Sequence, residues 1–261
     1  NLIYSNSDTD PYTTDLNSEV QKILDEKMGS ENYDVGHLFA YSSAGGDGNA
    51  GGVGTVCKSG AKGGAFSAHP FEGGVNEVFL NDHFDIDYVS HEIGHQFGAY
   101  HTFSHINEYE EVSAEPGSGS TIMGYAGIVG LDNLQQHSDP YFHYHSIDNI
   151  REYLARESCY TSAVNDNQTP TVSAGADLIL PIGTAYELKA TASDSDGDSL
   201  FYCWEQLDSG KVNASNFGPY NHLGAQARSF PPTSSPVRTV PTLEAVLSGA
   251  LTLENPTVGG R

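Results

Sequence analysis

The chain has 261 residues, and 38% of them are hydrophobic, which is enough to bury a core and argues against disorder along the whole chain. Lysine and arginine together number 11 against 34 aspartates and glutamates, so the formal net charge is −23 at pH 7. This charge argues against nucleic acids and anionic membrane surfaces as partners, because their phosphates would be repelled. No apolar run comes near the roughly 18 residues of a membrane-spanning helix.

The first part of the sequence predicts mixed helices and strands. Residues 2–4 form a short apolar run that predicts a strand. Asp15 is a candidate N-cap for a helix that ends at Met28, where Gly29 provides the stop signal. Residues 33–41 are apolar and rich in β-forming residues, which predicts an inner strand.

Three further elements are predicted in this part. Residues 53–57 interrupt a glycine-rich stretch and are a candidate edge strand. Apolar residues at positions i, i+4 and i+8 predict a second helix over residues 86–97, with Asp85 as its cap. A third helix is predicted over residues 147–157, where two large apolar residues share a face.

The character of the sequence changes at residues 164–170, a polar stretch that ends in proline and is typical of a linker. Beyond it, residues 186–192 and 200–204 alternate apolar and polar side chains around an acidic turn, which predicts two strands of an all-β module. Residues 243–251 have a helical pattern. We therefore expect a domain boundary between residues 163 and 164.

A histidine-rich motif on the second predicted helix, HEIGHQFGAYH over residues 91–101, indicates the chemistry. His91 and His95 are four residues apart and share a helix face, so both can reach one ion. Gly98 can adopt a positive φ and end the helix, which would return His101 to the same ion. Three neutral imidazoles leave one position open for water, as in catalytic zinc sites, and Glu92 stands where it can take a proton from that water.

The alternative is an amphipathic helix whose histidines are incidental. Five specified positions arise by chance in roughly one chain of this length in 10⁴, so the motif is specific. The functional interpretation is therefore favoured over the incidental one.

The motif resembles the extended zinc signature of the metzincin metalloproteases. Residues 120–125, STIMGY, resemble the methionine turn of that family. The wider stretches 115–128 and 138–143 resemble the secreted reprolysin-like, adamalysin-related proteases of marine and gliding bacteria. The resemblance extends over about residues 1–160 and implies an α+β (mixed) zinc-peptidase domain at residues 1–163. It also implies an extracellular zinc metalloendopeptidase that acts on protein or peptide substrates.

The resemblance implies a role for each matching residue. His91, His95 and His101 would bind Zn²⁺, and Glu92 would be the general base and then the proton donor to the leaving amine. Met123 would form an apolar floor under the site without binding the metal. An edge strand would pair with the substrate backbone, and its glycines suit close approach; this strand comprises Gly52, Val53, Gly54, Thr55 and Val56.

Two positions depart from the pattern that the resemblance implies. Thr102 stands where the animal adamalysin relatives have aspartate. Tyr125 stands two residues after Met123, as in astacin-like and serralysin-like relatives, where the tyrosine binds zinc or donates to the oxyanion. A catalytic role and a packing role for Tyr125 carry about equal weight.

The C-terminal part, residues 164–261, contains an acidic turn with Asp194, Asp196 and Asp198. An EF-hand is excluded, because its glycine belongs at loop position 6 whereas Gly197 would be at position 4. The turn and the YxW run after it resemble an Ig-like or polycystic-kidney-disease-type β-sandwich. Such a module binds Ca²⁺ through the turn and a carboxylate near the linker, here Asp166. A solvated turn without calcium carries equal weight.

Three cysteines allow at most one intrachain disulfide. Cys57 and Cys159 both belong to the proteolytic domain, so we expect them to pair and Cys203 to remain a free thiol. The resemblance further predicts that the N-terminal part of the catalytic domain is missing and the β module is incomplete. An associated N-terminal fragment or a second chain would then complete the sheet. The alternative is a divergent, naturally short domain whose sheet is completed by other segments.

Two other functions compete with the peptidase. One is an adhesive, matrix-binding protein with an inert peptidase domain, and the other is a different zinc hydrolase such as an amidase. The intact Glu92 counts against the first, because an inert site does not need its base. The methionine turn around Met123 counts against the second.

Overall fold

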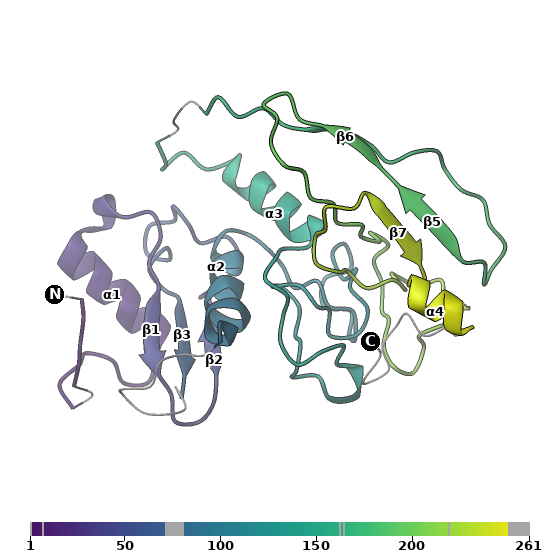
Figure 1. Cartoon of the computed structure of the whole chain (residues 1–261). Helices are drawn as coiled ribbons and strands as arrows, with labels where there is room; N and C mark the ends of the chain where they lie inside the picture. Colours follow the sequence, from purple (N-terminus) through teal and green to yellow (C-terminus); the bar gives the residue numbers. More distant parts are fainter. Residues whose placement is uncertain are drawn as a thin grey trace. The chain divides into compact units, whose positions relative to one another are not determined.

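A computed structural model describes residues 2–6, 8–70, 81–161, 163, 165–218 and 220–249 (Figure 1). The chain divides into two compact units, Asn1–Tyr100 with His145–Thr161 and His101–Tyr144 with Ser162–Arg261. The second unit groups residues 101–144 with the C-terminal part, while the predicted boundary between residues 163 and 164 stays a prediction. Within the described residues, no helix combines the length and the apolar character needed to cross a membrane.

The first unit is built on a three-stranded sheet with strand order β1-β3-β2. The central strand β3, Phe66–His69, pairs in parallel with β1, Leu38–Tyr41, so that Leu38 lies opposite Phe66. On its other side β3 pairs antiparallel with β2, Asp47–Asn49. The first three residues of β3 are buried, because helix α1, Leu16–Met28, and the helical segment at residues 84–90 pack against this strand, whereas β2 is largely exposed.

Helix α1, Leu16–Met28, confirms the predicted helix and both of its ends. The Asp15 carboxylate accepts a hydrogen bond from the Ser18 amide at 3.3 Å, which satisfies one of the unpaired donors of the first turn. Gly29 ends the helix with a φ of 81°, a conformation that favours glycine. Val20 and Gln21 are the buried residues of this helix.

The second helix is continuous but has two geometries. Its first part, η2, Phe84–Ser90, is a seven-residue π-helical segment, and the second, α2, His91–Gln96, is α-helical. The predicted helix at residues 86–97 is therefore correct in place, but Asp85 is not its cap. Asp85 lies inside η2, and the N-cap is His83 without a capping side-chain hydrogen bond.

Other boundaries differ from the sequence predictions. Residues 2–4 are not a strand, because they have no ladder partner in the structure. Of the strand predicted at residues 33–41, only β1 forms, and a 3₁₀ turn, Ser30–Asn32, precedes it. The third helix, α3, Tyr144–Leu154, begins and ends three residues earlier than predicted.

The edge strand predicted at residues 52–56 is wrong. These residues form bends and turns, and their amides bond to the end of the zinc-motif helix instead of to a strand. The Gly54 amide donates to the His95 carbonyl at 2.8 Å, and the amides of Thr55 and Val56 donate to the Gln96 carbonyl at 2.9 and 3.1 Å. The segment thus caps the helix C-terminus, and β2 is the strand at this edge of the sheet.

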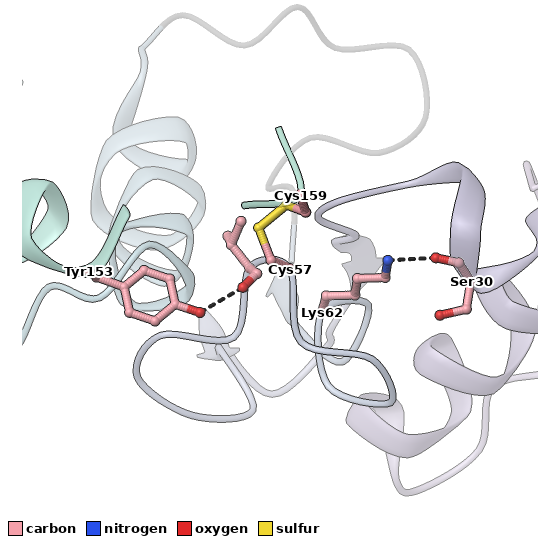
Figure 2. Close-up of a disulfide and its surroundings, with 6 residues drawn as sticks. Ser30, Cys57, Lys62, Tyr153 and Cys159 are labelled. Carbon is pink, nitrogen blue, oxygen red and sulfur yellow. Dashed lines mark hydrogen bonds between the residues drawn. A yellow bond between two sulfur atoms is a disulfide. The ribbon is translucent and has the colours of Figure 1, made fainter. Parts of the chain in front are cut away.

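A disulfide anchors the chain next to this cap (Figure 2). Cys57 and Cys159 are bonded, as predicted, and Cys203 is a free, exposed cysteine. The Tyr153 hydroxyl donates to the Val56 carbonyl at 2.6 Å, so α3 is joined to the same loop. The loop that caps the helix is therefore held both covalently and by a hydrogen bond.

The second unit contains two small two-stranded sheets. In one, β4, Thr171–Ser173, pairs antiparallel with β6, Thr191–Ser193; in the other, β5, Tyr186–Lys189, pairs antiparallel with β7, Val237–Val240. The run at residues 200–204 is not a strand, because only Tyr202 forms a bridge, with Thr233. The Ig-like sandwich is not confirmed.

The C-terminal helix forms over part of its predicted range. Helix α4, Leu243–Ser248, begins where predicted, with Thr242 as its N-cap. Gly249 ends it in the left-handed conformation, with a φ of 73°. Residues 250 and 251, which the prediction included, lie outside the described residues.

Residues 101–143 are nearly free of regular structure, although two stretches, 102–104 and 112–124, are buried. They contain one 3₁₀ turn, η3, Gly130–Asp132, and one parallel bridge between Phe103 and Glu115. Buried backbone groups need partners, and the C-terminal part supplies several of them. The Val212 amide donates to the Ser104 carbonyl at 2.9 Å, and the Gly117 amide donates to the Val212 carbonyl at 2.9 Å.

Candidate metal centre

Helix α2 presents two histidines on one face. His91 and His95 are 5% and 8% exposed, and their rings meet edge to face with centroids 4.8 Å apart. This arrangement follows from the four-residue spacing on an α-helix, which places the two side chains one above the other. The ligand nitrogens of His91, His95 and His101 all lie within 4.8 Å of one another.

Gly98 makes the turn that leads to the third histidine. Its φ is +103°, and its amide donates to the His95 carbonyl at 2.9 Å as the helix ends. A Cβ added at Gly98 would lie 2.6 Å from the Cβ of Tyr153, which is closer than two carbon atoms can approach. Glycine is thus required here both for the backbone conformation and for the packing of Tyr153.

Hydrogen bonds determine which ring nitrogen carries the proton in two of the three imidazoles. The Nδ1 of His95 donates to the Ala99 carbonyl at 2.7 Å, because a carbonyl oxygen can only accept. The Nδ1 of His101 lies 2.8 Å from the Glu108 carboxylate, which also only accepts in its ionised form. In both rings the lone pair is then on Nε2, as a zinc ligand requires. The donor set therefore fits a zinc ion.

The protonation of His95 suits a metal ligand as well. Burial lowers the pKa of His95, because the charged imidazolium loses its hydration. A neutral imidazole is the form that binds zinc. The environment of α2 therefore favours the ligand form of this histidine at neutral pH.

Glu92 belongs to α2, and its side chain contacts the edge strand β2 at Gly48. The pKa of Glu92 is raised to about 7, mainly because burial removes the hydration of its charged form; a hydrogen bond from the Ala50 backbone opposes the rise, and the charge of Asp47 adds to it. A Cβ added at Gly48 would meet the Glu92 carboxylate at 2.6 Å. Glycine at this position of β2 therefore leaves the space that the Glu92 side chain occupies.

The methionine turn contributes buried and aromatic groups near His101. Met123 is fully buried, and the Thr102 amide donates to its carbonyl at 3.1 Å. The Tyr125 ring meets the His101 ring edge to face, with centroids 4.5 Å apart, and also contacts Phe103 at 4.5 Å. These contacts show how Tyr125 packs, and its catalytic role stays a prediction.

The acidic turn brings its three carboxylates together. Oxygens of Asp194, Asp196 and Asp198 lie within 4.8 Å of one another. The amides of Asp196 and Asp198 donate to the Asp194 carboxylate at 2.8 and 3.3 Å, as in a tight turn. The amide of Gln168, a residue of the predicted linker, donates to Asp196 at 2.5 Å. Both interpretations of this turn, calcium ligand and solvated turn, remain predictions.

A comparison with protein families matches residues 1–154 to metallo-peptidase family M12B, reprolysin-like. The chain belongs to this family. The matched region contains the whole motif from His91 to His101 and the methionine turn. M12B reprolysin-like peptidases are zinc-dependent, and the three histidines supply a site of the required kind. Neither the curated proteins nor the solved structures include a match to this chain.

Sequence reasoning missed three groups around this reprolysin-like site. Glu108 bonds to His101, Glu115 bonds to the turn that precedes Met123, and Gly48 gives Glu92 its space. A carboxylate partner is expected for a zinc-binding histidine, so an acidic residue near His101 could have been sought. No spacing rule identifies Glu115 or Gly48, because their contacts depend on the tertiary fold.

Proposed function

We propose that this chain is a secreted zinc-dependent metalloendopeptidase that hydrolyses peptide bonds in proteins, with Glu92 as the general base. The convergence of the three histidine nitrogens within 4.8 Å carries the proposal. Two of these histidines are hydrogen-bonded in the tautomer that a metal ligand needs. Glu92 is adjacent to the first ligand on the same helix, and its carboxylate is intact.

The chemistry that zinc supplies when bound is polarisation of the scissile carbonyl and a lowered pKa of the attacking water. Glu92 accepts a proton from this water and then donates it to the leaving nitrogen. His91, His95 and His101 would hold the ion. In this proposal the Tyr125 hydroxyl donates a hydrogen bond to the carbonyl oxygen as its negative charge develops.

Strand β2 is the proposed docking strand for the substrate backbone. It lies at the edge of the sheet, so one side of its backbone has no strand partner among the described residues. An extended peptide can add to such an edge through main-chain hydrogen bonds. This places the peptide beside Gly48 and therefore near Glu92, whose carboxylate packs against that glycine.

The secreted location and a bound calcium ion belong to the same proposal. The Cys57–Cys159 disulfide supports an oxidising compartment outside the cytoplasm. Calcium would bind the carboxylates of Asp194, Asp196 and Asp198, with Asp166 as a further ligand. A melting temperature of the zinc-replenished protein that does not respond to millimolar calcium would contradict the calcium site.

The test is hydrolysis of casein by the purified chain with and without a zinc chelator. We expect activity that the chelator abolishes and that added zinc restores. Glu92→Gln should retain zinc by metal analysis but lose at least about 10²-fold in turnover, since an amide cannot accept the proton. Asp85→Asn, a matched change on η2, is the control and should keep its activity. Full activity in excess chelator, or in Glu92→Gln, would refute the proposal.

A further inference from the structure

Glu115 is a buried carboxylate in the second unit, with 1% of its surface exposed. Burying a carboxylate is costly unless hydrogen bonds replace its hydration. Its Oε2 accepts from the hydroxyls of Thr102 and Thr121 at 2.6 and 2.5 Å. Its Oε1 accepts from the amides of Ser120 and Thr121 at 3.0 and 3.2 Å. The two oxygens are thus satisfied by donors from two separate segments.

One of these segments follows the third histidine, and the other opens the methionine turn. Thr102 directly follows His101, and Ser120 and Thr121 open the turn that contains Met123. Backbone hydrogen bonds connect the same segments, because the Glu115 amide donates to the Thr102 carbonyl at 2.8 Å and the Thr102 amide donates to Met123. Glu115 is therefore the side chain that joins the loop of the third ligand to the methionine turn.

The packing around this carboxylate leaves no room for a larger neighbour. Gly119 has a φ of +68°, and a Cβ added there would lie 3.0 Å from the Glu115 Oε2. All the groups directed at the two oxygens can donate, and an ionised carboxylate is a pure acceptor. An amide in its place would direct an NH₂ group at donors, so a glutamine cannot satisfy the same network.

We propose that Glu115 is a positioning residue of the zinc site, whose carboxylate fixes the loop after His101 against the methionine turn. The inference rests on the proposed zinc function and extends it to a residue that does not touch the metal. Loss of this network lets the loop after His101 move, so the third nitrogen is no longer held in place. The consequence is weaker zinc binding as well as slower turnover.

The experiment measures zinc affinity by competition with a chromophoric chelator, together with peptidase kinetics at saturating zinc. Glu115→Gln should raise the zinc dissociation constant by about 10- to 100-fold, the range for residues that support metal ligands. It should also lower kcat more than it changes KM. Thr102→Val, which removes one donor and keeps the shape, should shift zinc affinity in the same direction. Thr102→Ser, which restores the hydroxyl, should bring it back toward the wild-type value.

Ser113→Ala is the matched control. Ser113 is as buried as Glu115, but its hydroxyl donates to the Tyr109 carbonyl at 3.0 Å and not to the carboxylate. Zinc affinity in this variant should stay within about twofold of wild type, far below the change expected for loss of a ligand support. If Glu115→Gln does not fold, the Thr102 pair carries the test.

The outcomes separate this inference from the function on which it rests. A wild-type chain that neither binds zinc nor cleaves casein overturns both. A wild-type chain that does both, with Glu115→Gln or Thr102→Val matching Ser113→Ala in zinc affinity, overturns the role of Glu115 alone. Zinc affinity that falls in Thr102→Val and recovers in Thr102→Ser supports it.

Discussion

The metal ligands come from two regions that are stabilised in different ways. His91 and His95 lie on a helix whose backbone satisfies its own hydrogen bonds and whose C-terminus is capped by residues 54–56. His101 begins a buried segment with almost no regular structure, where side chains such as Glu115 supply the hydrogen bonds. In the first region local geometry places the ligands, whereas in the second a tertiary network does.

This difference predicts that substitutions in the two regions will reduce stability in different ways. A helix tolerates many substitutions, because its hydrogen bonds are between backbone atoms. A buried loop depends on single side chains, and a donor or acceptor left without a partner there costs about 1–3 kcal/mol. The stability of the region around His91 and His95, the helix region, should therefore fall most when its anchors are changed. The stability of the region that begins at His101, the loop region, should fall most when individual buried residues are changed.

The largest effect on stability is expected from the disulfide that anchors the helix region. Cys57 and Cys159 are 102 residues apart, and closing a loop of that length stabilises a protein by about 4–5 kcal/mol in the chain-entropy model. Replacing both by serine should lower the free energy of unfolding by this amount in urea denaturation. Cys203→Ser, which changes a free cysteine, is the control. An equal loss in the control would contradict the prediction.

The loop region should respond most strongly to truncation of Met123. This side chain is fully buried, so Met123→Ala should leave a cavity and cost about 2–5 kcal/mol in thermal or urea unfolding. Met123→Leu keeps the volume and should cost less than about 1.5 kcal/mol. Met28, the other methionine of the sequence, is 43% exposed, and Met28→Ala should be nearly neutral. Equal costs for the two alanine variants would show that Met123 is not packed as described.

The pH dependence of the zinc-free protein tests the burial of Glu92. Its pKa is about 7 in the folded chain against an ordinary value of 4.5, so the folded state holds a proton that the unfolded chain releases. Stability should therefore fall as the pH rises from 4.5 to 7, by at most about 3 kcal/mol. In Glu92→Gln this loss should vanish, so the zinc-free variant melts higher than wild type at pH 8 but not at pH 4.5. Identical pH profiles would disprove the burial effect.

The smallest effect is expected from Tyr125→Phe. The ring contacts with His101 and Phe103 are retained, so only the hydroxyl is lost. If the hydroxyl acts in the transition state, kcat should fall by up to about tenfold, and KM should change less. Kinetics identical to wild type would assign Tyr125 to packing alone.

Much of the helix region could be predicted from sequence, because its signals are local. Asp15 and Gly29 define the ends of α1, and the four-residue spacing of His91 and His95 requires a helix. The disulfide was also predictable, from the positions of three cysteines. The helix signals depend on residues close together in the chain, and the disulfide prediction depends on two of the three cysteines belonging to the same predicted domain.

The edge strand was not predictable for two reasons. Residues 53–57 have the composition of a strand, but the end of α2 takes up their amides. The strand that forms, β2, has the sequence Asp-Gly-Asn, which is rare in strands, so its pairing with β3 comes from tertiary context. The Glu115 network was missed for a similar reason, since its donors are 5, 6 and 13 residues away in segments without periodicity.

The double constraint on Gly98 has a genetic consequence. In a Gly98→Ala allele, a second mutation that shortens Tyr153 would leave the collision with the Tyr153 Cβ, which every residue except glycine retains, and also the strained backbone, with its φ of +103°. The same mutation would remove the hydroxyl that bonds to Val56. A suppressor screen starting from this allele should therefore yield true revertants and no compensating change at position 153.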